Sequence, residues 1–195
     1  MTLRLIGLDC PACGSAMRGD RHDLLFFCAH CGSGALLEED GLEAVESTAL
    51  LPSPGRHPRI WRPAWIIEAE VTVGDRIRAD GRHTQGWTEE QTFVMPAFPL
   101  PLEDLIRLAR ALSQAAGTVG EVPREPIHGG TLSMEDALTL VRHIVVGDEV
   151  RRSDMLASVQ VTVNVAAHRL AAIPFEEVKG GLRCAVTGVT VRPAE

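Results

Sequence analysis

Hydrophobic and polar residues alternate along several stretches of the chain, which is the pattern of strands with one buried face. Gly180 and Gly181 separate the last two of these stretches and are typical of a hairpin turn. The strands predicted in this way span residues 64–73, 92–95, 156–165, 169–178 and 182–191.

Two segments between these strands have the period of a helix instead. Apolar residues recur at the spacing of one helix face over residues 102–116, and Gly117 follows as a stop signal. A second helix is predicted from Ser133, whose hydroxyl can cap the first turn, to about Val146, just before Gly147. Strands, two helices and further strands predict an α+β fold, with the helices packed on one face of a mainly antiparallel sheet.

Residues 41–60 separate two parts of the chain that differ in composition. Three prolines and a glycine in their second half exclude a long helix, so we interpret the segment as a Pro-rich connector. A short helix at residues 42–51, before the prolines, is compatible with the pattern. The chain is therefore predicted to comprise a small N-terminal module at residues 1–40, the connector at residues 41–60 and an α+β domain at residues 61–195.

Four of the five cysteines form two C-x-x-C pairs, each followed by glycine. Two residues between the members of a pair let both thiolates reach one metal ion from a single tight turn. Four thiolates complete the tetrahedral shell of a structural zinc ion and leave no position for water or substrate. We therefore predict one structural Zn²⁺ with the ligands Cys10, Cys13, Cys28 and Cys31.

Over residues 8–39 the chain resembles the zinc ribbon family, with rubredoxin-type C-P-x-C-G knuckles. This resemblance implies a module that docks onto a protein or contacts nucleic acid. Rubredoxin iron would use the same knuckles, but in that family the spacing is longer and the core is richer in aromatic residues. A redox dithiol would need only one pair beside a βαβ pattern, which is absent. We interpret His30, inside the second knuckle, as a solvated turn residue rather than a ligand.

The charge of the chain argues against nucleic acid as the main partner. The formal net charge is −7, and residues 1–40 carry three arginines against six carboxylates. Nucleic-acid binders usually display a basic surface because phosphate contacts supply most of their affinity. A local basic patch formed by Arg142, Arg151 and Arg152 would reopen this possibility. No run of eighteen apolar residues predicts a membrane span, and we expect a cytoplasmic protein.

Motifs of known catalytic chemistry are missing. There is no G-x-S-x-G, P-loop, G-x-G-x-x-G or H-E-x-x-H pattern. His128-Gly129-Gly130 is similar to an esterase oxyanion loop, but without a nucleophile elbow we interpret it as an ordinary loop. Cys184 beside His168 would be a candidate nucleophile, yet its apolar neighbours favour a buried, inert thiol.

Tryptophan supplies the candidate docking surface. Trp61 and Trp65 flank Arg62 after the Pro-rich segment, and Trp is favoured at interface hot spots. Packing of both rings in the core is the competing interpretation. We take Trp61, Arg62 and Trp65 as the candidate docking residues.

The function favoured by these observations is that of a non-enzymatic adaptor, or an assembly or accessory protein, acting through protein–protein contacts. Three alternatives stay open. The first is a nucleic-acid-associated regulator that uses the ribbon, and the second is an enzyme of unrecognised type with its pocket in residues 61–195. The third is a peripheral subunit of a larger membrane complex. A cleft that holds His128, His143 or His168 beside a carboxylate would favour an enzyme.

Overall fold

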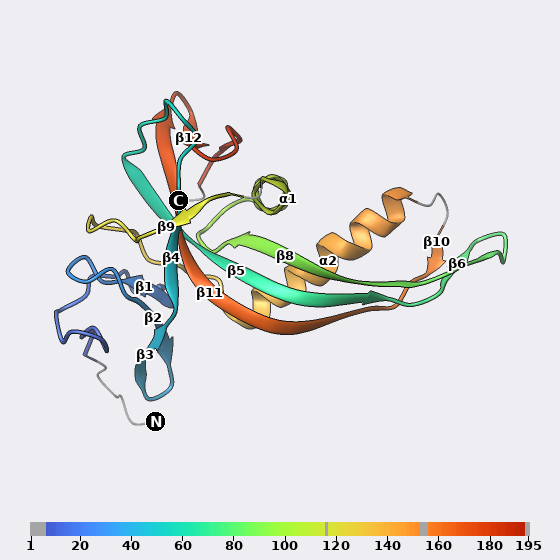
Figure 1. Ribbon diagram of the computed structural model, residues 1–195, viewed down its shortest axis with the longest axis horizontal. Helices are drawn as coiled ribbons and strands as arrows, with labels where there is room; N and C mark the ends of the chain where they lie inside the picture. Colours follow the sequence, from blue (N-terminus) through green and yellow to red (C-terminus); the bar gives the residue numbers. More distant parts are fainter. Residues whose placement is uncertain (1–6, 116, 153–155, 194–195) are drawn as a thin grey trace.

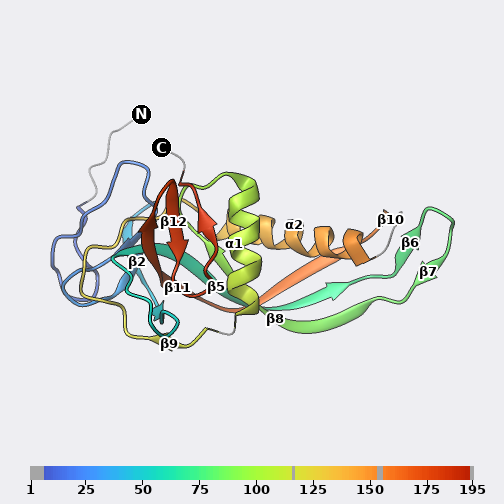
Figure 2. The same ribbon diagram turned by 90° about the horizontal axis from the view of Figure 1, so that it is seen from above.

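The computed structural model describes residues 7–115, 117–152 and 156–193, and it confirms the α+β fold class (Figure 1). Its centre is a long, curved ribbon of antiparallel strands, β5 (Ile60–Val73), β8 (Trp87–Pro96) and β11 (Val161–Val178). In this ribbon β5 pairs with β11 on one side and with β8 on the other. Helix α2 (Met134–Arg152) runs along one face of the ribbon, and α1 (Leu102–Gln114) crosses near one end (Figure 2).

Strand alternation in β5 builds two cores on opposite faces of the sheet. Trp65 and Ile67 belong to the cluster that includes the buried residues of α2, whereas Ala64 and Ile66 belong to a second cluster around Phe175. Helix α1 contributes side chains to both clusters. Only α2 therefore packs as expected on one face of the sheet, because α1 covers the end of the β8 edge.

The edge position of α1 is marked by a hydrogen bond to the sheet. The backbone N–H of Val94 in β8 donates to Ser113 Oγ of α1 at 2.9 Å. The hydroxyl thus satisfies a strand N–H that faces away from β5 and would otherwise be open. The helix begins at Leu102 as predicted and ends at Gln114, with Ala115 as its C-cap, whereas residue 116, the last of the predicted helix, lies outside the described residues.

Helix α2 is longer than predicted and continues through Gly147 to Arg152. Its extension is stabilised by Glu149, which is 1% exposed and binds three side chains from the last turn and the neighbouring strands. Trp87 Nε1 donates to Glu149 at 3.2 Å, Arg152 donates at 3.1 Å, and Arg76 forms an ion pair with it. A glycine costs about 1 kcal/mol in a helix, and these contacts hold the turn that follows Gly147.

The helix considered at residues 42–51 does not form, because these residues are strands. Strand β3 (Gly41–Val45) pairs with β2 (Gly34–Glu38), and β4 (Ser47–Leu50) pairs in parallel with β11. Thr48 Oγ1 donates to the carbonyl of Gly120, in the two-residue strand β9 (Val119–Gly120), at 2.9 Å. Sheet pairing therefore overrides local helix propensity in this segment.

Strand β11 joins two predicted strands into one. Its pairing register with β5 shifts between Val165 and Ala167. A β-bulge therefore lies between the two predicted strands, and the pairing with β5 continues on both sides of it. The predicted strand at residues 182–191 is interrupted by a turn. The shorter strands are β6 (Arg76–Arg78), β7 (His83–Thr84), β10 (Leu156–Ser158), β12 (Gly181–Cys184) and β13 (Thr190–Val191).

Strand β5 starts at Ile60 and tolerates Pro63, although proline is rare in central strands. The carbonyl of Pro63 accepts a hydrogen bond from Ala97 N–H at 2.9 Å, so the missing N–H would point to the same side. On that side Ala97 O already accepts a hydrogen bond from Thr131 N–H at 2.8 Å. The proline therefore leaves the carbonyl oxygen of Ala97 with a hydrogen bond, although Pro63 itself has no N–H to donate.

The described N-terminal residues share the core of the main sheet. In β1 (Leu25–Phe27) the side chain of Phe26 packs with Cys10 and Cys28, whereas Leu25 and Phe27 belong to the large cluster on β5. Strand alternation thus sends one side chain into the cysteine module, here residues 8–45, and two into the main core.

In the part of the chain that the structure describes, no helix is long and apolar enough to span a membrane.

Candidate metal centre

The first C-x-x-C pair lies in a tight turn that presents both thiols on one side. Cys10 N–H donates to Ser15 O at 2.9 Å, and Gly14 N–H donates back to Cys10 O at 2.8 Å. Gly14 has φ of 73°, a left-handed conformation that residues with a side chain rarely adopt. The glycine after the pair is therefore required by the turn itself.

The second pair repeats this geometry. Cys28 N–H donates to Ser33 O at 2.9 Å, Gly32 N–H donates to Cys28 O at 2.8 Å, and Gly32 has φ of 80°. Ser47, at the start of β4, holds this turn in place. Its hydroxyl donates to Gly32 O at 3.1 Å and accepts from Gly34 N–H at 3.0 Å.

The two turns face each other so that the four sulfur atoms form one cluster. Cys10 Sγ lies 3.7 Å from Cys31 Sγ, and Cys13 Sγ lies 3.7 Å from Cys28 Sγ. Four sulfurs bound tetrahedrally at about 2.3 Å from a zinc ion would be about 3.8 Å apart. All four ligand atoms lie within 4.8 Å of one another, so the cluster could hold a metal ion.

The thiols of this cluster differ in their environments. Burial raises the pKa of Cys10 to about 12, whereas hydrogen bonding to Ser33 lowers the pKa of Cys31 to about 6. Cys10 and Cys28 are buried, and Cys13 is exposed. A metal ion binds thiolates, so its positive charge would have to deprotonate Cys10 against the effect of burial.

Cys184 occupies a third turn of the same kind, which the sequence analysis missed. Cys184 N–H donates to Val189 O at 2.8 Å, Gly188 N–H donates to Cys184 O at 2.8 Å, and Gly188 has φ of 76°. Thr187 stands where the second cysteine of a knuckle would be. The signal was present in the sequence as a glycine four residues after the cysteine. Cys184 is fully buried, as predicted.

His128-Gly129-Gly130 packs against the cysteine module and joins it to the main domain, which is the described chain after residue 45. Gly130 N–H donates to Leu25 O at 2.9 Å, and Leu25 N–H donates to Gly130 O at 3.0 Å. A Cβ atom on Gly129 would lie 2.1 Å from the carboxylate of Asp23, and one on Gly130 would lie 2.8 Å from Ala97 O. Both glycines are thus explained by close packing.

The three candidate docking residues have different environments. Trp65 is fully buried, and its Nε1 donates to Leu132 O at 2.9 Å, so this ring is a core residue and cannot contact a partner. Trp61 and Arg62 are partly exposed. The guanidinium of Arg62 lies 5.8 Å from the ring centroid of Phe98, and its Nε is buried without a hydrogen-bond partner. Docking by Trp61 and Arg62 stays a prediction.

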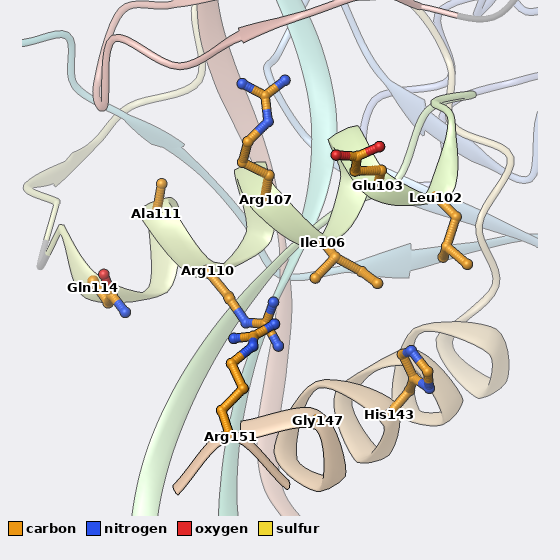
Figure 3. A pocket seen from close by; sticks show the side chains of 10 residues that line it. All are labelled: Leu102, Glu103, Ile106, Arg107, Arg110, Ala111, Gln114, His143, Gly147 and Arg151. Atoms are coloured by element: carbon orange, nitrogen blue, oxygen red, sulfur yellow. The ribbon is translucent and has the colours of Figure 1, made fainter. Parts of the chain in front are cut away.

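A groove that the sequence did not reveal lies between α1 and α2 (Figure 3). This groove has a volume of about 860 Å³. Arg110 of α1 and Arg151 of α2 point toward one another in it, and both form ion pairs with Asp148, at 2.9 and 3.0 Å. Leu102 and Ile106 give the other end an apolar surface, and Leu102 is 55% exposed.

A smaller cleft of about 220 Å³ lies where the cysteine module meets the main domain. His128 lines it together with Asp20 and Asp23. Partial burial and the positive charge of Arg62 lower the pKa of His128, so its ring is neutral near pH 7. The histidine has no hydrogen bond to either carboxylate in the described part of the structure. His143 is exposed and lines the groove between the helices, which also contains Glu103, and His168 is exposed.

In comparisons with known proteins, no family model, no curated protein and no solved structure matched the chain.

Proposed function

We propose that the chain is an adaptor, or an assembly or accessory protein, that acts through protein–protein contacts and contains a zinc ribbon with one structural Zn²⁺. The observation that carries the proposal is the convergence of four thiols on one point. Four cysteine ligands fill the coordination shell of zinc, so the ion would stabilise the fold and leave no position for a substrate.

The four thiolate ligands are compatible with zinc, the metal that we propose. Soft thiolates in a tetrahedral arrangement select zinc or iron. Burial of Cys10 and Cys28 under Phe26 and Met17 gives the site a small apolar core, as in modules whose folding is driven by the metal. The zinc content of the purified protein, with an absorption spectrum to detect iron–thiolate bands, tests this part of the proposal.

The groove between α1 and α2 is the surface that we assign to the partner. Arg110 and Arg151 share a single carboxylate, that of Asp148, so one guanidinium charge is not compensated within this group. The Nε of Arg110 is buried without a hydrogen-bond partner. A guanidinium that lacks a carboxylate of its own, beside an apolar surface, can bind an amphipathic segment of a partner protein. The partner segment would place an acidic residue at the guanidinium and apolar residues on the apolar surface.

A pull-down from the native host after nuclease treatment tests the adaptor role. The bait proteins are the wild type, the double variant R110Q/R151Q and the control R142Q, which removes an exposed arginine from the same helix. We expect a stoichiometric protein partner with the wild type and with R142Q. The double variant should retain much less of it, because the anion-binding group is lost.

The partner is then purified and titrated against each variant by calorimetry. A loss of about tenfold or more in affinity for R110Q/R151Q, and no change for R142Q, is the expected result for a charge-assisted contact. Equal binding of all three proteins would exclude the groove as the docking surface. A partner that disappears on nuclease treatment would instead favour the nucleic-acid-associated alternative.

The cleft that contains His128 is the observation that favours the enzyme alternative. A histidine beside two carboxylates meets the condition set by the sequence analysis, although no hydrogen bond links them in the described residues. Screening hydrolytic activities with the wild type and with His128→Ala tests it. Activity that is abolished by this substitution would replace the adaptor proposal.

A further inference from the structure

One edge of the central ribbon is open over half of its longest strand. Within the described part of the chain, residues 161–169 of β11 pair only with β5, and the next strand on the outer side, β4, begins its pairing at Leu170. In Figure 1, β11 forms the margin of the ribbon opposite β8. Strand edges of this length are rarely left unprotected, because their free N–H and C=O groups bind other strands.

The hydrogen bonds around this edge show which backbone groups are free. The carbonyl of Gln160 accepts from Gly74 N–H at 2.9 Å, so residue 160 points toward β5. Orientation alternates along a strand, and the bulge lies only after Val165. The N–H and C=O groups of Val161, Val163 and Val165 therefore point outward, away from β5.

The other edges of the main sheet carry the usual protection against pairing. The outer edge of β8 carries Glu89 and Glu90, and its end is closed by the hydrogen bond from Val94 to Ser113. Strands β9 and β13 have only two residues each. By contrast, residues 161–168 of β11 contain no charged residue and no proline.

We propose that this edge of β11 pairs with the same edge of a second copy of the chain, in antiparallel orientation with Val163 opposite its own symmetry mate. Val161 then lies opposite the partner's Val165, and each of the three outward-pointing residues meets another outward-pointing residue. Such pairs exchange both of their backbone hydrogen bonds. The two three-stranded ribbons would join into one continuous sheet around a two-fold axis.

In this register, side chains of similar polarity lie opposite each other across the two copies. Val161, Val163 and Val165 share the face that packs toward α2, so apolar residues lie beside apolar residues, and the 37% exposed Val165 is covered. On the opposite face the exposed Thr162 lies across from the partner's Asn164. A copy paired on β8 around Glu90 would instead place two carboxylates directly opposite each other, which is unfavourable.

A pair of charge variants on the exposed face tests this register. T162K/N164K places lysine opposite lysine twice in the dimer, whereas T162E/N164K places glutamate opposite lysine twice. Both variants retain the same lysine beside Glu70, the neighbour of Asn164 on β5, and they differ only in the charge at residue 162. Circular dichroism and thermal unfolding check that both variants are folded.

Light scattering and sedimentation across micromolar to millimolar concentrations provide the readout. We expect the wild type and T162E/N164K to reach twice the chain mass of 21.1 kDa, and the dimer dissociation constant of T162K/N164K to rise about tenfold or more. In hydrogen exchange, the amides of Val161, Val163 and Val165 should gain protection with concentration. A monomeric wild type, or equal dissociation constants for the two variants, would overturn the proposal.

Discussion

The turns at Cys28 and Cys184 have the same backbone conformation, but their cysteine side chains lie in different environments. In each, the cysteine N–H donates to the carbonyl five residues later, and a glycine four residues later donates back. Gly32 and Gly188 have φ of 80° and 76°. Yet Cys28 faces three other thiols, whereas Cys184 is packed among Phe175, Leu182 and other apolar side chains.

The difference shows that the knuckle backbone does not depend on a metal. A cysteine followed by glycine four residues later is enough for the turn when the surroundings hold it. At Cys184 this support comes from a hydrophobic core. The cysteine module has only a small core around Phe26, so a bound metal ion would supply much of the stability of its turns.

The largest effect is expected from Cys28→Ser. Loss of one ligand should abolish stoichiometric zinc binding and destabilise the cysteine module by several kcal/mol, since structural zinc contributes about 10–16 kcal/mol in isolated fingers. The melting temperature of the main domain should also fall, because Leu25 and Phe27 pack in its core. Metal analysis and calorimetry measure both. Full zinc content in this variant would refute the metal centre.

Cys184→Ser should leave the zinc content unchanged and still lower the stability. The side chain is fully buried in an apolar cluster, so a hydroxyl there loses packing and lacks a solvated environment. We expect a loss of about 1–3 kcal/mol, measured by urea denaturation. Cys184→Ala, which buries no polar group, should cost less. A change in bound zinc in either variant would contradict the separation of the two turns.

Gly188→Ala isolates the backbone requirement. No atom lies within 4 Å of the position of the new Cβ, so the cost comes from the left-handed conformation alone and should be about 1 kcal/mol. Gly14→Ala meets equally open space and should cost a similar amount in the zinc-loaded protein. Calorimetric unfolding of the two variants compares them. A much larger loss for one of the two would mean that their turns are not equivalent.

The smallest effect is expected from Thr187→Cys, which completes a third C-x-x-C-G pattern. Two thiols on one turn supply only half of a tetrahedral shell, so zinc stoichiometry should stay at one per chain. The stability should change by less than about 0.5 kcal/mol, because the turn is already formed. Metal analysis after dialysis against a weak chelator provides the measurement. A second tightly bound zinc ion would show that other ligands lie near this turn.

Local patterns predicted those features in which the local signal is strong. The apolar face at residues 102–112 predicted α1 because burial of that face against the sheet agrees with its helical period. Glycines after C-x-x-C predicted the knuckles because the turn needs positive φ at that residue. The helix considered at residues 42–51 was wrong because Thr48 and Ser47 form their hydrogen bonds with distant residues, which no local pattern reveals.

The sequence by itself determined the α+β fold class, the cysteine cluster and the burial of Cys184, because each depends on residue type and short-range spacing. The tertiary structure decided the rest. It buried Trp65, extended α2 through the ion pairs of Glu149, and joined two strands into β11. It also brought Arg110 and Arg151 together around one carboxylate and left one strand edge open. These features depend on contacts between residues far apart in the chain, whose energies local propensity does not contain.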